Sequence, residues 1–141
     1  MVLDVAKTLL ETGGYTCVIT DGENHHTSML RGVKPLVQYL QSGTIPEGLF
    51  AADKVIGKAT AFLYVLLRVK QVYAKIISES AVAVLQGQGI AVQYETLVPY
   101  IINRRGDGMC PFEQTVLEIE NPETAYAAVL RKMQEMNISL D

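Results

Sequence analysis

The sequence predicts an α/β fold in which a mixed sheet lies between layers of helices. Short β-branched, apolar runs alternate along the chain with longer segments of helical periodicity. A strand–helix–strand unit from Val72 to Tyr94 predicts parallel strands, and an Asp21-Gly22 pair between two strand-like runs predicts an antiparallel hairpin. The chain has 141 residues, of which 49% are hydrophobic, so we expect residues 1–141 to form one domain around a single core.

The first third of the chain predicts a helix, the hairpin and a second helix. Leu3–Glu11 has helical spacing and is followed by a pair of glycines, which favour a helix end. Tyr15–Thr20 predicts the first strand of the hairpin and His26–Leu30 its partner. Pro35 predicts the start of a helix that continues to about Gln41, before a loop rich in Gly, Pro and Ser.

The middle of the chain predicts the buried part of the fold. We expect Asp53 to cap the longest helix, which continues to about Lys70 with apolar positions almost all round it. Val72–Ile77 lacks polar alternation, which favours a central strand covered on both faces. Ser78 is then the predicted N-cap of a helix that continues through Leu85.

The last third predicts one strand, a glycine-rich loop and two helices. The strand is expected at Ile90–Tyr94, and the loop spans Asn103 to Cys110. One helix is expected to begin at Pro111, and the last is expected from Pro122 to about Met136.

Three separated motifs resemble an uncharacterised bacterial family of the cytidine deaminase-like superfamily. They are GVKPL at Gly32–Leu36, DKVIGKA at Asp53–Ala59 and NRRGDGMCPFE at Asn103–Glu113. The order of predicted elements is also similar to that superfamily, and the resemblance covers nearly the whole chain. It implies a three-layer α/β/α sandwich of the cytidine deaminase-like type, and it implies no established reaction.

Zinc-dependent deamination is not expected. True deaminases place His-x-Glu at the start of one helix and Pro-Cys-x-x-Cys at the start of the next. The corresponding positions here begin Asp53-Lys54-Val55 and Ser78-Glu79, which offer neither the imidazole nor the thiolate ligands that zinc prefers. The two histidines, His25 and His26, lie in the predicted hairpin and are expected to be solvated. We therefore expect no metal and no cofactor.

Composition and charge exclude several other functions. The net charge is −3 and the basic residues are scattered, which argues against a nucleic-acid partner. No apolar run approaches the ~18 residues of a membrane span, and the N-terminus does not resemble a signal peptide. Cys17 and Cys110 are too few and too far apart for a disulfide framework, so we expect a cytoplasmic protein. The apolar excess favours a homo-oligomer, most simply a dimer.

The Asn103–Glu113 stretch holds the strongest candidates for chemistry. Gly106 and Gly108 permit close approach of a ligand to the backbone. Cys110 is the expected N-cap of the helix that begins at Pro111, with Glu113 at the N3 position of a capping box, and unpaired N–H groups there would favour a thiolate. This predicts a nucleophilic or anion-binding loop; the alternative is an ordinary glycine-rich connection.

A composite site is predicted where this stretch meets the starts of two helices. Lys54 and Lys58 have i, i+4 spacing, and Ser78 and Glu79 begin the facing helix. We expect Lys54, Lys58 and Glu79 to approach four members of the motif, which are Asn103, Arg104, Cys110 and Glu113. Lys34 could also reach an anionic ligand. Each residue has a structural alternative: Lys58 at the surface, Ser78 as a plain cap, Glu79 bonded to first-turn N–H groups, and Lys34 solvated.

Two classes of function follow from these residues. The first is a metal-independent enzyme acting on a small anionic, nucleotide-like or nucleobase-like molecule. In it Cys110 is the nucleophile, Lys58 and Lys54 stabilise negative charge, and Glu79 or Glu113 transfers protons. The second is a non-catalytic ligand-binding or regulatory module that retains only the fold.

Overall fold

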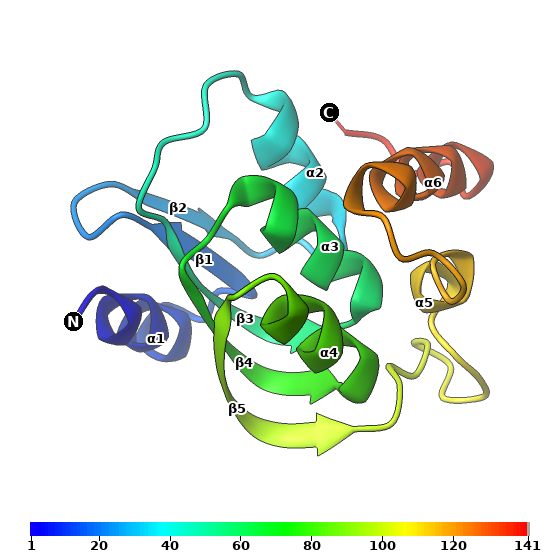
Figure 1. Ribbon diagram of the computed structural model, residues 1–141, viewed down its shortest axis with the longest axis horizontal. Coiled ribbons are helices and arrows are strands. Elements are labelled where there is room, and N and C mark those ends of the chain that lie inside the picture. Colours follow the sequence, from blue (N-terminus) through cyan, green and yellow to red (C-terminus); the bar gives the residue numbers. More distant parts are fainter. Residues whose placement is uncertain (141) are drawn as a thin grey trace.

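The computed structural model describes residues 1–140 as a mixed five-stranded sheet with helices packed against it (Figure 1). The strands follow the order β2-β1-β3-β4-β5. The elements are α1 (Val2–Gly13), β1 (Cys17–Thr20), β2 (His25–Ser28), α2 (Lys34–Gln41), β3 (Phe50–Ile56), α3 (Lys58–Leu67), β4 (Gln71–Ser78), α4 (Glu79–Gly87), β5 (Ala91–Val98), α5 (Pro111–Thr115) and α6 (Pro122–Glu135). None of the helices in this part of the chain is long and apolar enough to span a membrane.

The sheet combines parallel and antiparallel pairing, as the sequence predicts. β4 lies between β3 and β5 and is parallel to both, with α4 as the connection from β4 to β5. β1 is antiparallel to β2 and to β3, and places Cys17 opposite Asp53. The carboxyl ends of β3 and β4 therefore lie side by side at one end of the sheet, where α3 and α4 begin.

The two faces of the sheet carry different helices. On one face α1 buries Leu3, Ala6 and Leu10 against a small cluster that includes Val18 and Tyr73. The other face carries the larger core, with α3 at its centre, and α2, α5 and α6 pack around α3 (Figure 1). The apolar spacing of α3 explains this position, because eight of its residues are buried.

The predicted helix cap at Asp53 is wrong, because Asp53 lies inside strand β3. α3 begins five residues later at Lys58, with Gly57 as its N-cap. β3 was missed because its charged pair resembles a helix start, whereas both charges are accommodated in a strand: Asp53 is buried against a tyrosine of α3, and Lys54 is exposed. Lys54 and Lys58 consequently belong to different elements, and the expected i, i+4 relationship between them does not exist.

Two other local predictions have mixed outcomes. Ser78 is the N-cap of α4, as predicted, and its hydroxyl accepts a hydrogen bond from the backbone N–H of Ala81 at 3.2 Å. The expectation of two solvated histidines holds only for His25, which is exposed. His26 is half-buried, and its ring lies 4.6 Å from that of Tyr39, centroid to centroid.

Candidate functional site

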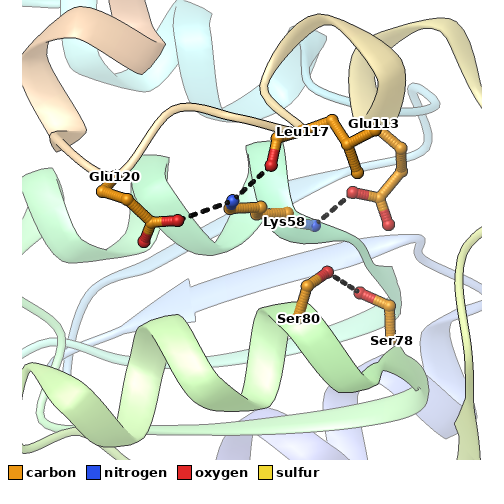
Figure 2. A network of polar contacts seen from close by, with 6 residues as sticks. All are labelled: Lys58, Ser78, Ser80, Glu113, Leu117 and Glu120. Carbon is orange, nitrogen blue, oxygen red and sulfur yellow. Dashed lines mark hydrogen bonds and ion pairs between the residues drawn. The ribbon is translucent and has the colours of Figure 1, made fainter.

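A buried carboxylate closes the start of α3 (Figure 2). Glu113, only 4% exposed, accepts a hydrogen bond on Oε2 from the backbone N–H of Lys58 at 2.7 Å. Its Oε1 lies 3.4 Å from the backbone nitrogen of Ile101, which also donates to it. First-turn N–H groups have no partner within their own helix, and the dipole favours negative charge there, so Glu113 acts as the anion at this helix N-terminus.

This arrangement corrects the predicted capping box. Glu113 does not bond back to its own helix; the backbone N–H of Cys110 donates instead to the carbonyl of Ile101 at 2.8 Å. Cys110 is the residue before α5, as predicted, but its side chain makes no capping hydrogen bond. The thiol is half-buried and packs against the core.

Gly57 makes room for the Glu113 carboxylate. A Cβ at this position would lie 2.8 Å from both Cδ and Oε1 of Glu113, and 3.1 Å from a side-chain carbon of Ile101. Those distances are below van der Waals contact, so any other residue would displace the carboxylate. The glycine of the DKVIGKA motif therefore serves close approach between two segments that are far apart in sequence.

Lys58 is a buried lysine with partners inside the chain. It is 6% exposed, and its Nζ donates to the carbonyl of Leu117 at 2.9 Å and pairs with the carboxylate of Glu120 at 3.4 Å. Figure 2 shows that the two nitrogens of Lys58 bind different partners. The backbone nitrogen points toward Glu113, and the ammonium points toward the segment after α5. Lys58 therefore does not extend to the surface, which was the structural alternative for this residue.

The other members of the predicted composite site do not join this network. The Ser78 hydroxyl lies 3.2 Å from that of Ser80, at the start of α4 (Figure 2). Glu79 and Lys54 are exposed, and within residues 1–140 neither side chain has an ion pair or a hydrogen bond. The structure thus brings Glu113 to Lys58 and leaves Lys54 and Glu79 outside their contacts.

The glycine-rich loop is held by its own hydrogen bonds. The Asn103 side-chain oxygen accepts from the backbone N–H of Gly106 at 2.8 Å and of Asp107 at 3.2 Å, and its amide donates to the Asp107 carboxylate at 2.8 Å. Gly106 has φ +76°, and the carbonyl of Gly108 accepts from the backbone N–H of Asn103. Asn103, Gly106 and Gly108 therefore build the loop that carries Arg104.

Arg104 and Lys34 meet at a hollow of about 340 Å³, which we call the basic hollow. Arg31 is the third cation on its lining. Apolar side chains form the rest of the wall, and they are Met29, Leu30, Val33, Phe112, Met133 and Ile138. Two of the three cations were candidates from the sequence; Arg31 was missed, although it directly precedes the GVKPL motif that contains Lys34.

The charges of the basic hollow are unbalanced. No aspartate or glutamate lines it, and none of Arg31, Lys34 and Arg104 has an ion pair or a side-chain hydrogen bond within residues 1–140. The neighbouring Arg105 differs, because its guanidinium lies 4.0 Å from the carboxylate of Asp107. Three cations and no carboxylate on one lining favour a positive local potential, although the whole chain has a net charge of −3.

A second buried network lies in the core beneath the sheet end. The Tyr64 hydroxyl donates to the Asp53 carboxylate at 2.7 Å and lies 3.3 Å from the Cys17 sulfur. Burial raises the pKa of Asp53 to about 7, although hydrogen bonds from Tyr64 and from the Val55 and Lys54 backbone oppose the shift. Burial also raises the pKa of the Cys17 thiol, and the nearby Asp53 charge adds to that effect. Cys17 thus packs in the core, and Asp53 is a core carboxyl.

Zinc does not fit the residues at the starts of α3 and α4. Gly57-Lys58 and Ser78-Glu79 provide no imidazole and no thiolate at these positions. In the part of the chain that the structure describes, no group of three or more His, Cys, Asp or Glu side chains is placed to hold a metal ion.

Comparison with other proteins identifies the family. The family model described as TM1506, domain of unknown function (DUF1893), matches residues 5–133. A crystal structure of a DUF1893 family protein, TM1506, from Thermotoga maritima is similar with a TM-score of 0.87 and 30% sequence identity, over 93% of this chain and 89% of that chain. No curated protein matches the sequence. The chain belongs to the DUF1893 family of domains of unknown function.

Proposed function

We propose that the protein binds a small molecule with an anionic group and an apolar or aromatic body in the basic hollow. The observation that carries this proposal is the convergence of Arg31, Lys34 and Arg104, without a partner among residues 1–140, on one concave apolar surface. Its volume of about 340 Å³ is in the range of small-molecule sites. A nucleotide-like ligand meets both requirements, because its phosphate suits the cations and its base suits the apolar part of the wall.

Binding without turnover is the function that the contacts favour. Among the groups expected to carry out chemistry at the composite site, Lys58 and Glu113 already have partners inside the chain, the Cys110 thiol packs against the core, and Glu79 lies outside their contacts. The cations of the basic hollow orient a ligand but supply no acid, base or activated nucleophile. We therefore propose a ligand-binding module in place of the Cys110 and Lys58 enzyme.

We also propose a more specific fold for the chain. Helices on both faces of a mixed sheet support a three-layer α/β/α sandwich of the cytidine deaminase-like type, adapted to binding without zinc. A cytoplasmic location accords with its two free cysteines.

Isothermal titration calorimetry with AMP and UMP tests the proposal. Both nucleotides should bind more tightly than adenosine, uridine or inorganic phosphate, because each of those lacks either the anion or the body. Arg104→Ala should weaken nucleotide binding about tenfold through loss of a charge-assisted contact. Arg105→Ala is the matched control, because Arg105 is the next residue, does not line the hollow and pairs with Asp107.

Two results would contradict the proposal. One is the absence of binding by either nucleotide at millimolar concentration. The other is equal weakening by Arg104→Ala and Arg105→Ala, because that would indicate attraction to general surface charge instead of a site.

A further inference from the structure

The outer side of β5 is a long, open sheet edge. β5 has eight residues and, among residues 1–140, pairs only with β4, so one row of its backbone N–H and C=O groups has no strand of this part of the chain beside it (Figure 1). All of its residues except Val92 and Val98 are exposed. The opposite edge of the sheet, β2, has four residues and carries two histidines, a threonine and a serine.

β5 lacks the usual protection of an edge strand. Edge strands commonly carry lysine, proline or an outward charge that prevents further pairing. β5 contains neither lysine, arginine nor proline, and its single charged residue is Glu95. The Tyr73 hydroxyl of the inner strand β4 donates to the Glu95 carboxylate, which draws this charge over the sheet and away from the open edge.

Exposed apolar side chains follow the same edge. Tyr94 and Leu97 are each 44% exposed within β5. Tyr100 and Ile102, in the segment that continues from it, are 45% and 58% exposed. Large apolar residues that gather beside unpaired backbone are typical of a surface that another strand covers.

We infer that β5 pairs with β5 of a second copy of this chain, antiparallel about a two-fold axis at Tyr94, to form one continuous sheet across the dimer. This surface is independent of the basic hollow, so the inference goes beyond ligand binding. A two-fold arrangement is closed and buries both open edges at once.

The sequence of β5 is complementary to itself in this register. Tyr94 lies opposite its own counterpart, and Gln93 lies opposite the partner's Glu95, so no like charges meet across the seam. Val92 lies opposite the partner's Thr96, which is a pair of β-branched residues, and Ala91 lies opposite the partner's Leu97. A foreign strand would have to supply this pattern, whereas a second copy supplies it by symmetry.

Sedimentation equilibrium of the full chain with charge variants at the axis tests this inference. The wild type should be a dimer at micromolar concentration. Tyr94→Lys and Tyr94→Glu should each raise the dissociation constant of the dimer at least about tenfold, because each places like charges opposite one another. An equimolar mixture of the two variants should recover the dimer, because the opposed charges then differ in sign.

Met136→Lys is the control, since Met136 is an exposed apolar residue, 42% exposed, just after α6. It should leave the dimer intact, and circular dichroism should show that every variant is folded. A monomeric wild type, a dimer that survives both single variants, or a mixture that stays monomeric would overturn the inference.

Discussion

The start of α3 and the basic hollow use the same stretch of sequence in opposite ways. Glu113 lies at the start of α3, where both it and Lys58 have partners inside the chain. Arg104, nine positions earlier, lines the hollow with Arg31 and Lys34, and none of the three cations has a partner within residues 1–140. One conspicuous motif thus contains a residue whose partners lie inside the chain, Glu113, and a residue that has none within residues 1–140, Arg104. Mutations should therefore affect stability at the first region and ligand binding at the second.

The largest effect on stability is expected from Asp53, which is buried and, like Glu113, has its hydrogen-bond partners inside the chain. Its pKa in the fold is about 7, above the value of about 3.9 in an unfolded chain, so the unfolded state loses its proton first. Stability from this group is complete below about pH 4 and is lost as the pH rises to about 7. Asp53→Asn removes that loss of stability. The new side-chain amide can still bond to the Tyr64 hydroxyl, because that hydroxyl also contacts the Cys17 sulfur and can donate its proton there while it accepts from the amide.

Urea unfolding at several pH values measures this prediction. Relative to wild type, Asp53→Asn should gain up to about 4 kcal/mol between pH 4 and pH 8. Parallel curves for the two proteins would show that Asp53 does not titrate between these limits in the fold.

The next effect is expected from Glu113→Ala. The change leaves the backbone N–H groups of Lys58 and Ile101 without their acceptor in a buried setting, which should cost about 2–4 kcal/mol of unfolding free energy. Glu118→Ala is the matched control, because Glu118 is exposed and has no partner within residues 1–140, and it should change stability by less than about 0.5 kcal/mol. Similar losses of unfolding free energy in the two variants would contradict a stabilising role for Glu113 at the start of α3.

The smallest effect is expected from the basic hollow. In ligand-free protein, Lys34→Ala and Arg104→Ala should each change the free energy of unfolding by less than about 0.5 kcal/mol, because neither side chain gives up an internal partner. Urea unfolding checks this value directly. A loss above about 1 kcal/mol from either variant would mean that the cation supports the fold, and the contrast with Glu113 would disappear.

Local signals were sufficient for much of the fold. The Ser78 cap, the hairpin at Asp21-Gly22 and the parallel unit around α4 each depend on residues within a few positions of one another, and sequence spacing reports those contacts directly. β3 was missed because its charged pair is accommodated by tertiary contacts. The buried position of Asp53 depends on Tyr64 of α3, and no local pattern contains that information.

The candidate site was harder to predict for the same reason. Spacing predicted that Glu113 bonds to the first turn of its own helix, whereas its carboxylate binds the backbone N–H of Lys58 at the start of α3, a contact that depends on tertiary packing. Lys34 and Arg104 were identified as residue types suited to an anion, whereas their convergence with Arg31 depends on the packing of α2, α5 and α6 around α3.

The Glu113 cap also bears on how the chain is synthesised. The carboxylate that closes α3 is encoded 55 residues after the nitrogen it binds. At about 5–20 residues per second, a ribosome needs about 3–11 s to add those residues. During that interval the nascent chain holds α3 with its first turn uncapped and without the helices α5 and α6 that pack on it. α3 therefore gains its cap and these packing partners only after the C-terminal third of the chain has been synthesised.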